Sequence, residues 1–185
     1  MSDSPLSLAA RLAAPAPIHR RSFIAALREG FHRGIQPVCT AERIAEIEGD
    51  FARYLREITD QSGMITLPTG EAVPRVPHSI RWLVEQDAFI GEVSIRHRLN
   101  DYLRQAGGHI GYGIRPSRRG RGYGRLILAL ALEECRRLGI DRVLVTSKAA
   151  NAASVRIIEA NGGELDNVID APDGGGPLRR YWIAL

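Results

Sequence analysis

The sequence predicts a mixed α/β (α+β) fold in which helices flank a central β-sheet on both faces. A strand, a helix and a second strand follow one another between Gly108 and Thr146. The usual handedness of such crossovers makes this segment a right-handed parallel unit. Apolar residues at helical spacing precede it, and hairpin patterns lie before and after it, so the sheet is expected to be mixed.

Length and composition predict one domain with an N-terminal extension. A chain of 185 residues buries roughly two-thirds of its unfolded surface when it folds. Apolar residues make up 44% and charged residues 25% of the chain, which excludes a disordered protein. Residues 1–20 contain three prolines and are expected to form a flexible tail, and residues 21–185 form the domain.

Two helices are expected in the first third of the chain. Ser22 is the predicted N-cap of a short helix that ends near Gly30 or Gly34. Thr40 begins a longer helix with an apolar stripe, which must face the core. The stripe consists of Ile44, Ile47, Phe51, Leu55 and Ile58.

The rest of the chain alternates between strands and helices after a Pro/Gly-rich connection over residues 61–78. Pro116 ends one strand because proline cannot donate to a β-ladder. The helix that follows is apolar nearly all round its first turns and is expected to be largely buried. The expected strands are 82–84, 89–95, 108–115, 142–146, 164–169 and 178–184, and the expected helices are 121–138 and 151–160.

Several classes of protein are excluded by what the sequence lacks. No apolar run approaches the roughly 20 residues that span a bilayer, and the N-terminus has no apolar signal segment. We therefore expect no membrane association and a cytoplasmic location. Cys39 and Cys135 are the only cysteines, without a CxxC pair or clustered His, so we expect reduced thiols and no metal.

The densest positive patch lies where the strand that Pro116 ends meets the next helix. Five arginines fall within eleven positions, and no acidic residue interrupts them. The first amides of a helix have no internal partner, and its dipole favours an anion at that end. Glycines let the backbone approach a ligand, and guanidinium groups suit phosphate oxygens. The patch therefore predicts a pyrophosphate site.

Neither a P-loop nor a complete GxGxxG motif is present in this patch. The run Arg119-Gly120-Arg121-Gly122-Tyr123-Gly124 instead matches [Q/R]xxGx[G/A] and resembles the acetyl-CoA signature of the GNAT acetyltransferase superfamily. Asn151, Ser154 and the Asn161-Gly162-Gly163 turn resemble the second segment of that family. The similarity covers residues 22–185 and is strongest to a bacterial subgroup of predicted acetyltransferases of unknown substrate.

The resemblance implies a GNAT fold whose middle strands splay apart and hold the pantetheine arm of acetyl-CoA, which serves as co-substrate. The pyrophosphate would lie on the amides of Arg119 to Gly124, with Asn151 and Ser154 on the other side of the arm. Ile114 and Arg115 would offer backbone groups to the pantetheine. Asn151 has a second interpretation as a plain helix cap. The cofactor-binding residues are Ile114, Arg115, Arg119, Gly120, Arg121, Gly122, Tyr123, Gly124, Asn151 and Ser154.

Two residues are candidates for the general base that deprotonates the amine. His109 begins the strand leading to the pyrophosphate turn, near where the superfamily often places a carboxylate, and imidazole titrates near neutral pH. Glu92, on the preceding strand, is the other candidate. Strand alternation places His109, Gly111 and Gly113 on one face, where the glycines leave room for a ligand or for a tightly packed helix.

The family's tyrosine acid, seven residues after the Asn of the second segment, is replaced here by Ile158. Tyr181 is the predicted substitute, with Tyr112 as an alternative, although a buried aromatic role is open for both. One of these tyrosines is thus the predicted proton source for the leaving thiolate. The alternative is that the thiolate leaves without a dedicated acid.

The sequence thus predicts an N-acetyltransferase that moves the acetyl group of acetyl-CoA to a primary amine of a small molecule by direct attack. A protein N-terminus or lysine is the alternative acceptor, and a non-catalytic acyl-CoA sensor is a second alternative. A nucleic-acid-binding module is disfavoured because the arginine patch has no aromatic platform or helix-turn-helix pattern. The oligomeric state stays open, a homodimer included.

Overall fold

The computed structural model describes residues 10–34, 36–67 and 70–185. These residues form two compact units. Unit 1 comprises Met1–Thr59, Ile80–Val93 and Tyr112–Leu130, and unit 2 comprises Asp60–Ser79, Ser94–Gly111 and Ala131–Leu185. The units alternate along the chain and share strands, so the prediction of a single domain over residues 21–185 stays a prediction.

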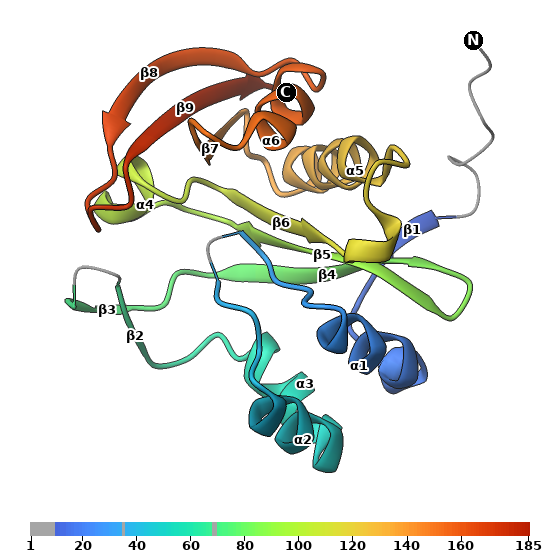
Figure 1. The fold of residues 1–185 in the computed structure, drawn as a ribbon. Helices are drawn as coiled ribbons and strands as arrows, with labels where there is room; N and C mark the ends of the chain where they lie inside the picture. Colours follow the sequence, from blue (N-terminus) through green and yellow to red (C-terminus); the bar gives the residue numbers. More distant parts are fainter. Residues whose placement is uncertain (1–9, 35, 68–69) are drawn as a thin grey trace, which may run out of the picture. The chain divides into compact units, whose positions relative to one another are not determined.

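A four-stranded sheet has the order β1-β4-β5-β6. Its strands are β1 (Ala10–Ala13), β4 (His78–Glu85), β5 (Ala88–Arg96) and β6 (Ile110–Ile114). The predicted strands 82–84 and 89–95 are confirmed within β4 and β5, and the predicted strand 108–115 is found as the shorter β6. Figure 1 shows α1 (Arg20–Arg28), α2 (Ala41–Gly49) and α3 (Phe51–Thr59) on the same face of β4 and β5. The predicted class, a mixed α/β chain with helices flanking a sheet, is confirmed.

The expected tail is ordered from Ala10 onward, and residues 1–9 lie outside the described residues. β1 pairs antiparallel with β4, with Ala10 opposite Glu85 and Ala13 opposite Trp82. A 3-10 turn (Pro17–His19) follows, and His19 is buried. The sequence analysis missed this strand because edge pairing uses backbone groups, and the residues of β1 carry no strand pattern.

The first helix starts two residues before the predicted N-cap. Ser22 lies inside α1, where its Oγ accepts hydrogen bonds from the Phe89 amide (2.9 Å) and from Nη1 of Arg115 (3.1 Å). The prediction that Ser22 caps the helix is wrong, because its hydroxyl serves tertiary contacts instead. The predicted end is confirmed, since Gly30 follows the helix with a φ of 84°.

The predicted long helix is interrupted at Asp50. Thr40 caps α2 as expected, its Oγ1 accepting from the Arg43 amide at 3.2 Å. Asp50 then leaves the helical conformation with φ −133°, and its Oδ1 accepts from the Arg53 amide at 2.9 Å. Asp50 therefore caps α3, and the expected single helix is two. The periodic stripe conceals the break because its spacing continues across it.

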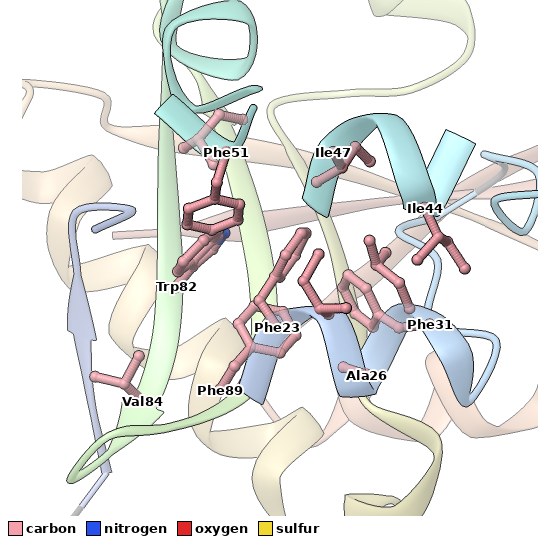
Figure 2. Packing of buried hydrophobic residues seen from close by; sticks show 12 residues of the cluster. Phe23, Ala26, Phe31, Ile44, Ile47, Phe51, Trp82, Val84 and Phe89 are labelled. Carbon is pink, nitrogen blue, oxygen red and sulfur yellow. The ribbon is translucent and has the colours of Figure 1, made fainter. Parts of the chain in front are cut away.

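An aromatic cluster forms the core of unit 1 (Figure 2). Phe23 stacks on Trp82 with ring centroids 4.7 Å apart and an interplanar angle of 13°. Phe89 stands edge-on to both rings, at 5.0 Å from Phe23 and 5.3 Å from Trp82. Edge-on and offset contacts of this kind stabilise by about 0.5–1.5 kcal/mol each beyond area burial.

Unit 2 contains short elements that the sequence analysis missed. Within the stretch read as irregular, β2 (Met64–Thr66) and β3 (Ala72–Pro74) form an antiparallel hairpin. α4 (Asp101–Gln105) is capped by Asn100, whose Oδ1 accepts from the Leu103 amide at 2.9 Å. Three-residue strands and a five-residue helix are too short for a periodic pattern to emerge.

The second sheet, also in unit 2, matches the prediction closely. β7 (Arg142–Lys148), β9 (Pro177–Ala184) and β8 (Glu164–Asp170) pair antiparallel in the order β7-β9-β8, and α6 (Ala152–Glu159) follows β7. β6 and β7 belong to different sheets. The two strands of the predicted parallel unit are therefore not paired in one sheet.

Replacing Phe23 tests whether the aromatic cluster carries the stability of unit 1. Phe23 is 1% exposed, so Phe23→Ala leaves a cavity and should lower the free energy of unfolding by about 3–5 kcal/mol. Ile18→Ala is the control, because Ile18 is 67% exposed and its loss should change stability by less than about 0.5 kcal/mol. Urea unfolding measures both, and equal effects would contradict this account of the core.

Candidate functional site

The predicted pyrophosphate turn joins β6 to α5 (Tyr123–Arg137) in unit 1. Arg115 follows β6, a 3-10 turn (Pro116–Arg118) comes next, and Arg119 to Gly122 lead into the helix. Gly120 and Gly122 have φ of 74° and 82°. Side chains at such angles are strained, so the turn requires glycine at both positions.

Three consecutive amides in this turn are free to bind an anion. In the part of the chain that the structure describes, no hydrogen bond joins the backbone amides of Gly120, Arg121 and Gly122 to another group. The Leu126 amide donates to the Gly122 carbonyl at 3.1 Å and so starts the helical bonding. The amides before it lie at the positive end of the α5 dipole, which favours a negative charge there.

Arg115 and Arg119, two arginines of the patch, have partners in unit 1. Arg115 binds Glu29 through Nε (2.9 Å) and Nη2 (2.5 Å), and this contact lowers the pKa of Glu29 to about 2. Arg119 donates from Nε to the Ile114 carbonyl at 3.0 Å. Arg121 is exposed beside the free amides. The charge available to a ligand therefore comes mainly from the middle of the turn.

Three further predicted cofactor residues of unit 1 have protein partners. Tyr123 is buried and its hydroxyl donates to Glu85, at 3.3 Å from each carboxylate oxygen. The Arg115 amide donates to the Ile90 carbonyl at 2.9 Å. The Ile114 carbonyl already accepts from Arg119, and its second lone pair is the group left for a ligand.

Glu92 is a buried carboxylate with a partner at each oxygen. Its Oε2 accepts from Nε1 of Trp82 at 2.9 Å, and its Oε1 lies 3.1 Å from Nη1 of Arg33. The Arg33 contact is an ion pair without a well-aligned hydrogen bond, because Nη1 lacks a partner of good geometry. Both oxygens of Glu92 therefore already have a protein partner.

His109 lies in unit 2, where β6 begins. Its amide donates to the Leu144 carbonyl at 2.7 Å, and its Nδ1 accepts from the Leu144 amide at 2.9 Å. Burial, together with the charges of Arg96 and Arg104, lowers the pKa of His109 from 6.5 to about 4. The imidazole ring is therefore neutral and carries its proton on Nε2. The lone pair of Nδ1 is already used by the hydrogen bond from the Leu144 amide.

The other predicted residues of unit 2 have structural contacts. Tyr181 is fully buried, and its hydroxyl donates to Oε1 of Glu159 at 3.2 Å. Asn151 caps α6, its Oδ1 accepting from the Ser154 amide at 3.1 Å, so the helix-cap interpretation applies. The side-chain amide of Asn151 can still donate to a ligand. Ile158, in place of the family's tyrosine, is fully buried.

The sequence analysis missed Glu29 and Arg33. Glu29 holds Arg115, and Arg33 holds Glu92, across 86 and 59 positions of sequence. They lie at the end of α1 and in the loop after it, where no spacing pattern marks them. A charge of opposite sign elsewhere in the chain is too common a signal to identify such pairs.

Metal ligands and membrane helices were also sought among the described residues. No group of three or more His, Cys, Asp or Glu side chains is arranged there to hold a metal ion. Within residues 10–34, 36–67 and 70–185, every helix is too short or too polar to cross a membrane. Both cysteines are free thiols, and burial raises the pKa of Cys135 to about 12.

A turn with free amides at the start of a helix, reached from a strand and flanked by arginines, is typical of a site that binds the phosphates of a nucleotide or coenzyme. The model of the GNAT acetyltransferase domain matches residues 43–164. The chain therefore belongs to the GNAT acetyltransferases and is a GNAT-type acyltransferase. A comparison with curated proteins gives no match.

Solved structures with the same fold are GNAT acetyltransferases of several kinds. One is the Salmonella typhimurium enzyme that modifies the N-terminal serine of ribosomal protein L7/L12 (16% identity, TM-score 0.61, 98% of each chain covered). Another is a putative acetyltransferase of Salmonella typhimurium with its cofactor acetyl-CoA (18%, 0.56, 96% of this chain and 94% of that one). A third is AAC(6')-Ib in complex with ribostamycin and coenzyme A (14%, 0.62, 95% and 93%). At these identities the likeness shows a common fold.

The contacts of His109 predict a pH-dependent stability. The unfolded chain binds a proton at His109 below pH 6.5, whereas the folded chain binds it only near pH 4. The stability that the neutral His109 ring contributes is therefore complete above pH 6.5 and has been lost once the pH has fallen through 4. Between pH 7 and 4, unfolding free energy should fall by about 3 kcal/mol more in the wild type than in His109→Asn, whose Oδ1 takes the place of Nδ1 as the acceptor for Leu144. Urea titrations measure this, and parallel curves would contradict the assignment.

Proposed function

We propose that the chain transfers the acetyl group of acetyl-CoA to a primary amine of a small molecule by direct attack of the amine on the thioester. The observation that carries the proposal is the run of three free amides at Gly120, Arg121 and Gly122, at the positive end of α5. Membership of the GNAT family supports acetyl-CoA as the ligand that supplies the anion.

In this proposal the amides and arginines of Arg119 to Gly124 bind the pyrophosphate. The Ile114 and Arg115 backbone, with Asn151 and Ser154, would contact the pantetheine arm. Charge-assisted hydrogen bonds from guanidinium and amide donors are about twice as strong as neutral ones, which suits a diphosphate. The space beside Gly120 and Gly122 supports this role, because a Cβ built at either position meets no atom within 4 Å.

The reaction requires deprotonation and positioning of the amine. An alkylamine of pKa about 10.4 is neutral in roughly one molecule in 2,500 at pH 7, which adds about 4–5 kcal/mol to the barrier. Holding both substrates in one groove contributes up to about 7–11 kcal/mol. His109 and Glu92 as base, and Tyr181 as acid, remain predictions. Each already has a protein partner, which argues for an additional base.

A small-molecule acceptor is favoured by the size of a cavity in unit 2. This cavity measures about 410 Å³, within the range of small-ligand sites, and it lies between the β2–β3 hairpin and the start of α4. Both signs of charge line it, from Glu71, Asp101, Arg75 and Arg98. The solved enzyme that modifies the N-terminal serine of ribosomal protein L7/L12 keeps a protein N-terminus as the second candidate, whereas the one in complex with ribostamycin supports a small-molecule acceptor.

Gly122→Glu tests the pyrophosphate site. A side chain at φ 82° with a negative charge should abolish acetyl-CoA binding, lowering affinity by at least about 100-fold by repelling the diphosphate. Gly174→Glu is the matched control, since Gly174 has a φ of 72°, a Cβ there meets nothing, and the same charge is added. Isothermal titration calorimetry measures both, and unchanged affinity in Gly122→Glu would remove the site.

Acetyl-CoA turnover across a panel of amines tests the reaction itself. The panel holds monoamines, polyamines, aminoglycosides and peptides with free N-termini, and thiol release is followed with a chromogenic disulfide. Turnover with one class of small amine supports the proposal. Turnover with peptides alone identifies a protein acetyltransferase, and binding without turnover on any amine identifies a sensor.

A further inference from the structure

A cavity of unit 2 is lined by charges of both signs that do not pair with one another. It measures about 410 Å³ and lies between the β2–β3 hairpin and the start of α4. Each of its two sides carries one carboxylate and one guanidinium group, from Glu71 and Arg75 on the hairpin side and from Asp101 and Arg98 on the other. In the part of the chain that the structure describes, none of the four forms an ion pair.

Backbone contacts fix one charged residue on each side of the cavity. Nε of Arg75 donates to the Ser62 carbonyl at 3.2 Å, which leaves the two Nη atoms of its guanidinium group for other partners. Asp101 is the first residue of α4, and the side chain of Asn100 caps that helix. Opposite charges near a protein surface attract each other, yet here they stay apart. The cavity therefore offers unneutralised donors and acceptors to a ligand.

The lining as a whole favours a ligand that carries both signs of charge. Two carboxylates balance two guanidinium groups, so the net charge of the lining is zero. A polyamine would meet two arginines of its own sign and a phosphate two carboxylates of its own sign, whereas a zwitterion finds an opposite charge for each of its groups. Apolar surface is contributed by Leu67, Val73, Val76 and Tyr102. The lining therefore suits a zwitterion with an apolar part.

We propose that this cavity binds a free amino acid with an apolar or aromatic side chain, and that the α-amino group of this amino acid is the acetyl acceptor. The inference rests on the proposed function, because it names the class of its small-molecule substrate. Arg75 and Arg98 hold the carboxylate, since a guanidinium group matches both oxygens of a carboxylate. The ammonium group lies against Glu71 and Asp101, and the side chain packs on the apolar surface.

The reaction consumes the charge that holds the substrate. The ammonium group loses one proton to solvent, and the neutral nitrogen attacks the carbonyl carbon of the thioester. The C–N bond forms, the C–S bond breaks, and the second proton of the nitrogen passes to the departing thiolate. The products are the N-acetyl amino acid and the free thiol of coenzyme A. Because the acetylated nitrogen carries no charge, Glu71 and Asp101 no longer hold it, and the product leaves more easily than the substrate.

Calorimetry with the full chain tests the site with four ligands that differ in charge. L-phenylalanine carries both charges, its amide lacks the carboxylate, N-acetylphenylalanine lacks the ammonium group, and spermidine carries positive charge alone. Phenylalanine should bind at least about 10-fold more tightly than each of the others, because only its two charges both find an opposite charge. Equal affinity for phenylalanine and its amide, tighter binding of spermidine, or no binding of phenylalanine and leucine alike would overturn the inference.

Variants that remove a single charge assign the two ends of the ligand. Arg98→Gln should weaken phenylalanine binding by about 10-fold and leave the affinity for its amide unchanged, and Asp101→Asn should weaken phenylalanine binding but not that of N-acetylphenylalanine. Arg98 and Asp101 are exposed, so both variants should fold. Arg136→Gln is the matched control, because Arg136 is exposed on α5 and does not line the cavity. Equal loss of phenylalanine and amide binding in Arg98→Gln would overturn the assignment of the carboxylate.

Thiol release from acetyl-CoA separates this inference from the proposed function. The wild type should turn over phenylalanine with a kcat/KM at least about 10-fold above that for its amide, and Arg98→Gln should remove this preference. Turnover of polyamines or aminoglycosides without phenylalanine binding supports the proposed function and overturns the inference. Charge-dependent phenylalanine binding without turnover of any amine rejects the acetyl transfer and keeps the cavity as an amino-acid site.

Discussion

Unit 1 depends on the burial of Trp82, which belongs at once to the apolar core and to a polar cluster. Its ring stacks on Phe23 at 4.7 Å, and its Nε1 donates to Glu92 at 2.9 Å. A buried indole N–H needs an acceptor, and a buried carboxylate needs donors and a counter-charge. Glu92 satisfies the first requirement and Arg33 the second. The aromatic packing therefore fixes the position of an ion pair, and the ion pair fixes the loop after α1.

The anion-binding turn obeys a different constraint, which is local. Gly120 and Gly122 adopt φ of 74° and 82°, so the backbone turns its amides outward before α5 begins. The neighbouring arginines have separate tasks, because Arg115 is tied to Glu29 whereas Arg121 is exposed. A dense cluster of like charge is thus partly neutralised by the fold itself. In the proposed site a ligand would meet chiefly a set of oriented backbone dipoles, which require no reorganisation on binding.

Sequence reasoning succeeded where one residue type determines local geometry. The Thr40 cap, the turn after Ile114 and the Asn151 cap follow from side-chain or glycine preferences that need no tertiary partner. It failed where the partner is distant: β1 pairs through its backbone, and Ser22 serves Phe89 and Arg115 rather than its own helix. The break at Asp50 lies between these cases, since aspartate is a good cap but the apolar stripe continues past it.

His109 shows most directly why residue type alone does not decide catalytic roles. His109 has the right residue type on the right strand, yet Leu144 takes its free lone pair and burial lowers its pKa to about 4. Proton transfer needs an accessible lone pair as well as a suitable pKa, and the first condition is set by contacts that no spacing reveals. The fold of unit 2 therefore leaves His109 no free lone pair with which to take a proton.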